Sequence, residues 1–124
     1  MPWETSVFDE IATVREVTVV VPAPDRDPIR VPVWVVAVDG QLYARSWKGE
    51  TGLWYRRARR HGTGAVATST GEHPVRFVPV ADAGLDAAID REYLTKYAGA
   101  QYAQAMIEPP ATGTTLRLDP AITS

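Results

Sequence analysis

The chain has 124 residues, no cysteine and a formal net charge of −2. This length predicts a single domain spanning residues 1–124, and the lack of cysteine excludes disulfide frameworks, zinc–thiolate sites and thiol catalysis. The longest apolar run, around Trp34, is too short to cross a bilayer, and the N-terminus lacks the pattern of a secretory signal. We therefore expect a cytoplasmic protein without a membrane partner.

The first 30 residues predict a helix, a strand and a loop. A short helix is expected over 5–12 with Thr5 or Ser6 as its cap, and a β-branched strand over 16–21. The prolines and aspartates of 22–28 predict a loop, because proline cannot donate a hydrogen bond to a central ladder.

Asp39-Gly40 lies between two apolar runs and predicts a tight hairpin of strands 33–38 and 41–46, because a type I′ turn needs positive φ at both central residues. A two-residue loop fixes the register. One face of the hairpin is then compact and apolar and predicts a core. The other face presents outward a group that could hold a flat anionic ligand: Trp34, Tyr43 and Arg45.

The middle of the chain predicts a second helix and a second hairpin. A glycine-flanked connection over 48–52 leads into a helix over 53–61, which Gly62 ends. Strands over 64–70 and 74–80 are expected to form a hairpin around Thr70-Gly71.

The last third predicts a long helix, a short helix and a final strand. Asp82 or Asp86 is expected to cap a helix with apolar residues at helical spacing, and its charged face, including Asp90 and Lys96, is expected to be solvated. A short helix over 101–107, a strand over 114–118 and a frayed tail over 120–124 follow. The pattern predicts a mainly β protein of the α+β class, a small six-stranded barrel with short helices between strands.

Two interpretations of Trp34 and Arg45 remain open at this stage. As cross-strand neighbours they form a structural cation–π pair, or Arg45, helped by Ser46 and Lys48, receives a phosphate or carboxylate. An arginine braced on an aromatic ring is pre-organised for an anion, so the two interpretations are compatible.

The aromatic residues Trp47, Trp54 and Tyr55 flank the loop over 48–52. They predict either core or dimer-interface packing, or a wall for a planar ring. The backbone N–H groups from Gly49 to Leu53 would face such a ligand, because the first turn of a helix leaves its donors unpaired.

Six of the 13 basic residues lie between Arg45 and Arg60. The arginines of 56–60 spread around more than half of a helix, which is typical of a solvated face, so nucleic acid is an unlikely partner. The two histidines have no carboxylates at ligand spacing, and we expect no metal site.

Several segments together resemble an uncharacterised bacterial family of the FMN-binding split-barrel type. The segments are Val33-Trp34-Val35-Val36, Leu42-Tyr43-Ala44-Arg45-Ser46, Gly52-Leu53-Trp54-Tyr55-Arg56, Glu92-Tyr93-Leu94-Thr95-Lys96-Tyr97 and Thr115-Leu116-Arg117-Leu118. The resemblance implies a split barrel that forms a homodimer and binds a flavin.

The central part is similar, more distantly, to deazaflavin-dependent nitroreductases, through Arg45-Ser46-Trp47-Lys48-Gly49, Trp54-Tyr55 and Ala65-Val66-Ala67-Thr68. In that group the loop and the helix start hold the cofactor's phosphate tail. This chain inserts Trp47 and has a single glycine after the lysine, which leaves the choice between FMN and a deazaflavin coenzyme open. The resemblance implies that the cofactor is bound by Tyr43, Arg45, Ser46, Lys48, Gly49, Trp54 and Tyr55.

Two functions are expected from these observations. The first is an oxidoreductase that passes hydride between the bound cofactor and a small substrate, with no catalytic side chain identified. The second is a non-catalytic module on the same fold that binds a small anionic or planar ligand or another partner.

Overall fold

The computed structural model describes residues 3–23 and 26–121. The elements in chain order are α1 (Thr5–Thr13), β1 (Val17–Ala23), β2 (Arg26–Val33), β3 (Val35–Val38), β4 (Gln41–Ala44), the 3₁₀ turn η1 (Gly49–Thr51), α2 (Leu53–His61), β5 (Thr63–Thr68), β6 (Gly71–Pro79), α3 (Ala83–Lys96), the 3₁₀ turns η2 (Gln104–Ile107) and η3 (Ala111–Thr114), and β7 (Leu116–Pro120). No helix within these described ranges is long and apolar enough to cross a membrane.

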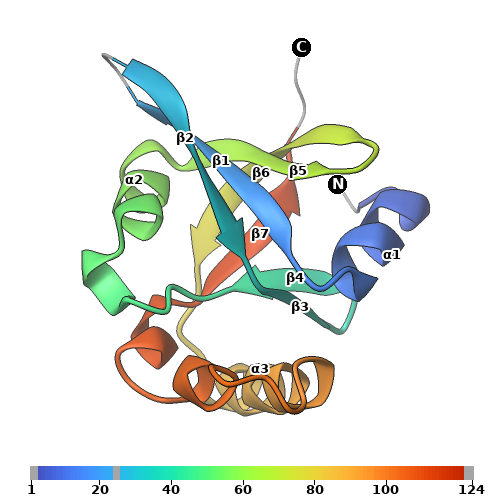
Figure 1. Cartoon of the computed structure of the whole chain (residues 1–124), viewed down its shortest axis with the longest axis vertical. Coiled ribbons are helices and arrows are strands. Elements are labelled where there is room, and N and C mark those ends of the chain that lie inside the picture. The colour runs from blue at the N-terminus through green and yellow to red at the C-terminus, as the bar shows by residue number, and fades with distance from the viewer. Residues whose placement is uncertain (1–2, 24–25, 122–124) are drawn as a thin grey trace.

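The strands form one antiparallel sheet in the order β2-β1-β5-β6-β7-β4-β3. The two outer strands, β2 and β3, follow each other in the chain and are separated only by Trp34. A flat sheet would hold its two edges far apart, so this connection requires the sheet to curl until its edges meet. The fold is therefore an α+β half-barrel, with α3 packed outside it (Figure 1).

The sheet has seven strands in the described residues, one more than the six predicted. Strand β1 extends over 22–23 and strand β2 begins at 26, so both enter the predicted loop over 22–28, and β2 continues to Val33. Its two prolines, Pro28 and Pro32, are tolerated because β2 is an edge strand and needs a ladder hydrogen bond on one side only. The prediction of a loop is therefore wrong for Pro28, which lies in an edge strand.

One hydrophobic core fills the hollow of the curled sheet. All seven strands contribute to it, and α1 and α2 close it with Ile11, Trp54, Tyr55 and Ala58. The α2 helix begins and ends where predicted, and Gly62 terminates it at a φ of 76°, a left-handed conformation that glycine adopts without strain.

A second core lies on the outer face of the β3–β4 hairpin. Val36 and Tyr43 pack there against Ile89, Tyr93 and Tyr97 of α3, with Ala103 and Met106 beside them. The prediction that this face points outward is wrong, because α3 covers it and leaves Tyr43 only 5% exposed. Both faces of the hairpin are buried.

The tyrosine Tyr93 connects the hairpin to α3 through its hydroxyl group. The observed register pairs Val36 with Tyr43 and ends at the pair Val35–Ala44. The next pair would be Trp34 with Arg45, but the Tyr93 hydroxyl lies between them. It accepts a hydrogen bond from the backbone N–H of Arg45 at 3.1 Å and donates one to the carbonyl of Trp34 at 2.9 Å. A side chain thus replaces a rung of the ladder and holds the two strands apart.

The free edge of β3 is also protected by α3. The carbonyl of Val35 accepts hydrogen bonds from the Lys96 ammonium and from the Tyr97 hydroxyl. Among the described residues no carboxylate forms an ion pair with Lys96, and partial burial lowers its pKa to about 8. Lys96, predicted to be solvated, therefore contributes to covering the sheet edge.

Three local predictions need correction. Glu4, rather than Thr5 or Ser6, is the N-cap of α1, and the second hairpin turns at 69–70, because Thr68 pairs with Gly71. The predicted tail over 120–124 is wrong at its first two residues, since Pro120 belongs to β7 and the N–H of Ala121 donates to the carbonyl of Pro74. The rest of that tail, 122–124, lies outside the described residues.

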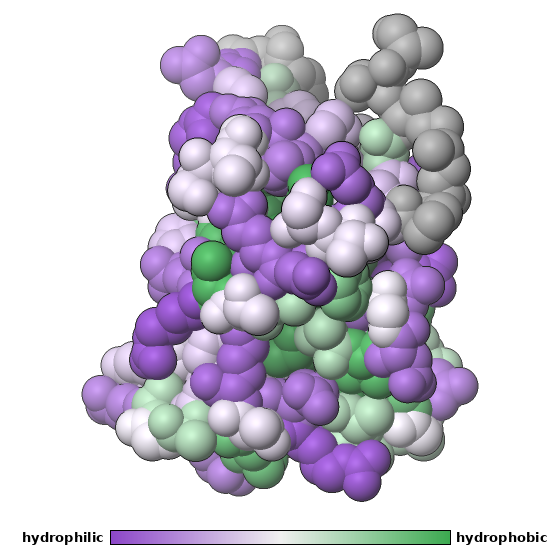
Figure 2. Space-filling view, turned by 90° about the vertical axis from the view of Figure 1, so that its right-hand side faces the viewer, coloured by the Kyte–Doolittle hydropathy of each residue, from purple (hydrophilic) through white to green (hydrophobic). Residues whose placement is uncertain are grey.

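The side of the molecule that carries α1 is mainly hydrophilic, with hydrophobic side chains showing in its recessed middle (Figure 2). The large apolar side chains that are most exposed in the described residues are Trp47, Leu53, Leu94 and Tyr102. The segment 45–53, which carries the first two, lies on the opposite side, at the left in Figure 1.

We expect Tyr93→Phe to destabilise the fold by about 1–3 kcal/mol, because the buried N–H of Arg45 and the carbonyl of Trp34 would lose their partner. Urea unfolding measures the change, with Tyr102→Phe as a control at a half-exposed position. A change as small as the control's would mean that the two strands close the rung without the hydroxyl.

Candidate active or binding site

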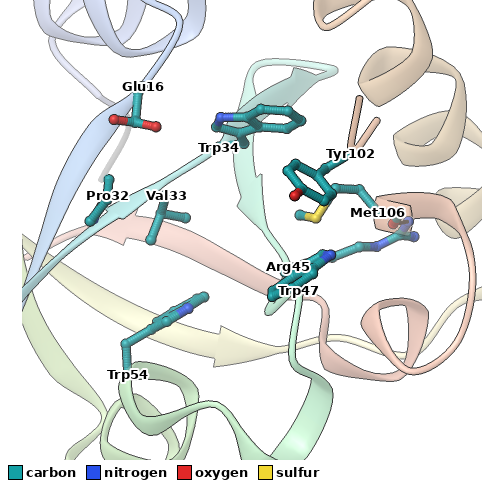
Figure 3. A pocket seen from close by; sticks show the side chains of 9 residues that line it. All are labelled: Glu16, Pro32, Val33, Trp34, Arg45, Trp47, Trp54, Tyr102 and Met106. Carbon is teal, nitrogen blue, oxygen red and sulfur yellow. Dashed lines mark hydrogen bonds between the residues drawn. The ribbon is translucent and has the colours of Figure 1, made fainter. Parts of the chain in front are cut away.

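A cavity of about 350 Å³ opens where the two edges of the sheet meet. Its lining comes from the residue before β1, from β2 and the junction to β3, from the segment after β4, from α2 and from the segment around η2. The residues are Glu16, Pro32, Val33, Trp34, Arg45, Trp47, Trp54, Tyr102 and Met106 (Figure 3). Three of the four tryptophans in the chain are among them. The walls are therefore mainly aromatic.

The aromatic walls come from separate parts of the chain. Trp34 stacks on Tyr97 with ring centroids 4.1 Å apart and 4° between the planes, so one of its faces is fixed by α3. Trp47 meets Tyr102 edge to face at 5.5 Å, and both are half-exposed at the rim. In Figure 3 Trp34 and Trp54 lie on opposite sides of the cavity, with Tyr102 and Met106 at one end. The cavity therefore has aromatic side chains on opposite sides and at one end.

The guanidinium of Arg45 is fully used within the protein. Its Nε donates to Thr115 at 2.9 Å, Nη1 donates to Asp90 and to the carbonyl of Met106, and Nη2 donates to the carbonyl and the carboxylate of Asp86. Arginine has five N–H donors, and here each nitrogen has as many acceptors as it has hydrogens. No donor of Arg45 is left to receive a ligand anion.

The partners of Arg45 explain why the residue is buried. Both aspartates lie on α3, and the Arg45 side chain has no exposed surface, whereas each carboxylate side chain is 34% exposed. Two carboxylates facing one guanidinium leave this cluster with a net negative charge. The prediction of a solvated face was wrong for Asp90.

The predicted stacking of Arg45 on Trp34 is also wrong. Arg45 lies over the ring of Tyr93 at 5.8 Å, and the cation over Trp34 is Arg15, at 5.6 Å from the ring centroid. The hydroxyl of Tyr93 keeps the two predicted neighbours apart.

The loop residues predicted to contact a ligand support the fold around the cavity. Ser46 is buried, and its N–H donates to the hydroxyl of Thr114 at 2.8 Å. Gly49 packs against Pro110 so closely that a Cβ would lie 2.5 Å from the proline Cβ, and its φ of 70° also favours glycine. Lys48 is exposed at the start of η1.

Two tyrosines that were predicted to contact the cofactor lie in the hydrophobic cores and do not line the cavity. Tyr43 belongs to the second core, and Tyr55 belongs to the first core, where its hydroxyl accepts a hydrogen bond from Arg59 at 2.8 Å. Of the seven predicted cofactor-binding residues, Arg45 and Trp54 line the cavity. A direct ligand contact by the other five stays a prediction.

Glu16, Tyr102 and Met106 line the cavity but were not predicted from the sequence as site residues. Glu16 precedes β1, whereas Tyr102 and Met106 belong to the segment around η2, more than 80 residues later. No local pattern joins them, because the curl of the sheet and the return of the chain after α3 bring them together. The one indirect indication was the short helix predicted over 101–107, which contains both Tyr102 and Met106.

A family model described as "Uncharacterized protein conserved in bacteria (DUF2255)" matches residues 7–118. The chain belongs to the DUF2255 family. This confirms the predicted membership in an uncharacterised bacterial family. A comparison of the DUF2255 chain with curated proteins finds no match.

Two solved structures resemble the DUF2255 chain in fold. The conserved hypothetical protein Rv2991 from Mycobacterium tuberculosis has a TM-score of 0.62 at 16% identity, over 98% of this chain and 82% of that one. The FAD and heme binding protein from Mycobacterium smegmatis has a TM-score of 0.59 at 17% identity, over 99% of this chain and 68% of that one. Both likenesses concern the fold.

We expect Arg45→Met to destabilise the DUF2255 protein by about 2–4 kcal/mol, because Asp86 and Asp90 would lose their counterion while remaining largely covered. Arg30→Met is the matched control, since the Arg30–Glu72 pair is exposed and is worth less than about 1 kcal/mol. Chemical unfolding of both variants tests this. Equal effects would contradict a structural role for the Arg45 cluster.

Proposed function

We propose that this protein binds a small planar ligand of the flavin kind in the cavity between Trp34 and Trp54, on a fold of the split-barrel type. The observation that carries the proposal is the aromatic lining of a cavity of about 350 Å³ at the junction of the sheet edges. A solved structure with the same fold is described as an FAD and heme binding protein, which supports a planar ring as the ligand.

The residues fit the ring of such a cofactor better than its phosphate. Trp34, Trp47 and Trp54 offer surfaces on which a flat ring would stack, whereas the donors of Arg45 are all used. FMN and a deazaflavin coenzyme remain the proposed cofactors, with any phosphate held outside the Arg45 cluster. Either ring would supply hydride transfer when bound. The chain's own residues would position it and restrict its contact with water.

Binding without turnover is the second proposed function. The donors of Arg45 are all used within the protein. The other titratable side chains that line the cavity are Glu16 and Tyr102. The lining thus provides few groups for proton transfer, and this supports a protein that binds its ligand without catalysing a reaction. Reduction of the bound ring by a hydride donor would favour an oxidoreductase, and stable binding without reduction would favour the module.

The first experiment adds riboflavin to ¹⁵N-labelled protein and follows the four tryptophan indole N–H signals. We expect the signals of Trp34, Trp47 and Trp54 to shift and that of Trp3 to stay, because the Trp3 indole donates to the carbonyl of Leu118 away from the cavity lining. Trp47→Leu should weaken binding about tenfold, by loss of one stacking surface. Leu94→Ala, at an exposed position of α3, is the control.

The proposal of a ring site fails if none of the three cavity indoles responds to riboflavin, FMN or a deazaflavin coenzyme. It also fails if Trp3 shifts as strongly as the others, because that would indicate contact outside the cavity.

We also propose that the protein is a homodimer, with a second copy covering the rim of the cavity. Trp47, Leu53 and Tyr102 are each 50% exposed, and their burial would stabilise association. Sedimentation equilibrium should give about twice the chain mass of 13.6 kDa, and Leu53→Glu should give the monomer mass. Wild-type protein at the single-chain mass would contradict the dimer.

A further inference from the structure

The charges around the cavity favour a ligand opposite in sign to the one expected from the sequence. From the sequence, an anion was expected at Arg45. The guanidinium of Arg45 already donates hydrogen bonds to the carboxylates of two aspartates and to two backbone carbonyl groups. The remaining charged lining residue is Glu16, which is exposed and forms no ion pair within residues 3–23 and 26–121. We propose that the cavity is an aromatic cage that selects a small planar organic cation, such as an N-alkylated pyridinium ring.

The aromatic walls supply the first attraction. A cation is stabilised over the face of an indole or phenol ring, most strongly over tryptophan. Trp34 and Trp54 lie on opposite sides of the cavity, and Tyr102 lies at one end in edge-to-face contact with Trp47 (Figure 3). Trp34 already attracts the guanidinium of Arg15, which lies 5.6 Å from its ring centroid. A ligand cation between these walls would meet several electron-rich surfaces at once.

The carboxylate of Glu16 supplies the second attraction. Figure 3 places Glu16 at the end of the cavity opposite Met106, on the same side as Trp34. A carboxylate beside aromatic rings that exclude part of the water interacts with a cation more strongly than it would in bulk solvent. The soft thioether of Met106 at the other end accommodates a ring edge without adding charge.

Two arginines lie close to aromatic lining residues, one in space and one along the chain. Arg15 lies over Trp34 and Tyr97, and Arg57 lies one helical turn after Trp54, but neither lines the cavity. The Arg45 cluster contains one guanidinium and the carboxylates of Asp86 and Asp90, so it also disfavours an incoming anion.

This inference rests on the proposed planar-ligand site but not on the proposed cofactors, because a cationic ring differs in charge from FMN and from a deazaflavin coenzyme, which carry negative phosphate groups. The test uses three rings of nearly equal size that differ in charge: 1-methylnicotinamide (+1), nicotinamide (neutral) and nicotinate (−1). Binding is measured from the tryptophan indole N–H signals of wild-type protein, with Trp3 as the internal reference. We expect the cation to bind at least about tenfold more tightly than the anion, with the neutral ring between them.

Substitutions of Glu16 and Trp47 separate the two sources of selectivity, the carboxylate and the aromatic wall. Glu16→Gln should reduce the cation-to-anion preference to within about threefold, whereas Glu92→Gln, on the exposed face of α3, should leave it unchanged. Trp47→Phe should keep the preference and Trp47→Leu should lower it, because only phenylalanine retains an aromatic face. Each substitution is at an exposed or half-exposed position, so the fold is expected to persist.

The outcomes distinguish this inference from the proposed function. Riboflavin binding together with equal affinities for the three probes, an anion preference, or no effect of Glu16→Gln would overturn the cationic cage and leave the planar-ligand site standing. A cation preference without riboflavin binding would support the cage and reject the flavin. Absence of binding by every ring would reject both.

Discussion

The hydroxyl group of Tyr93 determines how the hairpin, the long helix and the cavity fit together. It takes the place of the ladder rung between Trp34 and Arg45, and it comes from α3, so the same two hydrogen bonds anchor the helix and part the strands. Because the strands part there, Trp34 is free to stack on Tyr97 and the Arg45 side chain can extend toward α3. Full burial raises the pKa of Tyr93, which keeps the hydroxyl proton in place for its role as a donor.

The buried arginine shows why residue type alone is a weak guide to a ligand. An arginine next to a glycine-containing loop and tryptophans has the composition of an anion site, yet its function in this fold is to join β4 to α3 and to the start of β7. Its donors are satisfied by groups that lie 41 to 70 residues away in the chain. The charged lining residue that forms no ion pair within the described part of the chain is the carboxylate of Glu16.

The parts of the fold that depend on local chemistry could be predicted from the sequence. Asp39 and Gly40 have the positive φ values, 50° and 78°, that a type I′ turn needs, and the register near that turn is as expected. Asp82 caps α3 by accepting a hydrogen bond from the N–H of Leu85. Trp54, predicted either as core or interface packing or as a wall for a planar ring, belongs to the first core and also lines the cavity.

The rest depended on contacts between distant segments. A hairpin with one apolar face gives no sign of which helix will cover its other face, so the burial of Tyr43 was missed. Asp86 and Asp90 are four residues apart and lie on the same side of α3 as Ile89 and Tyr93, a spacing that fits a buried stripe as well as a solvated one. The contribution of Glu16 to the cavity requires the curl of the whole sheet.

The direct connection from β2 to β3 through Trp34 also disfavours shifts in the pairing register of the sheet. A strand that slips by one residue turns its whole buried face toward solvent, and edge strands are usually the most prone to this error. Here the two edges belong to one continuous stretch of chain, so a slip of β2 along β1 would move β3 along β4 as well. Val33 and Val35, on either side of Trp34, are both buried in the same core and would leave it together. The continuous segment therefore couples the register of the β1–β2 ladder to that of the β3–β4 ladder.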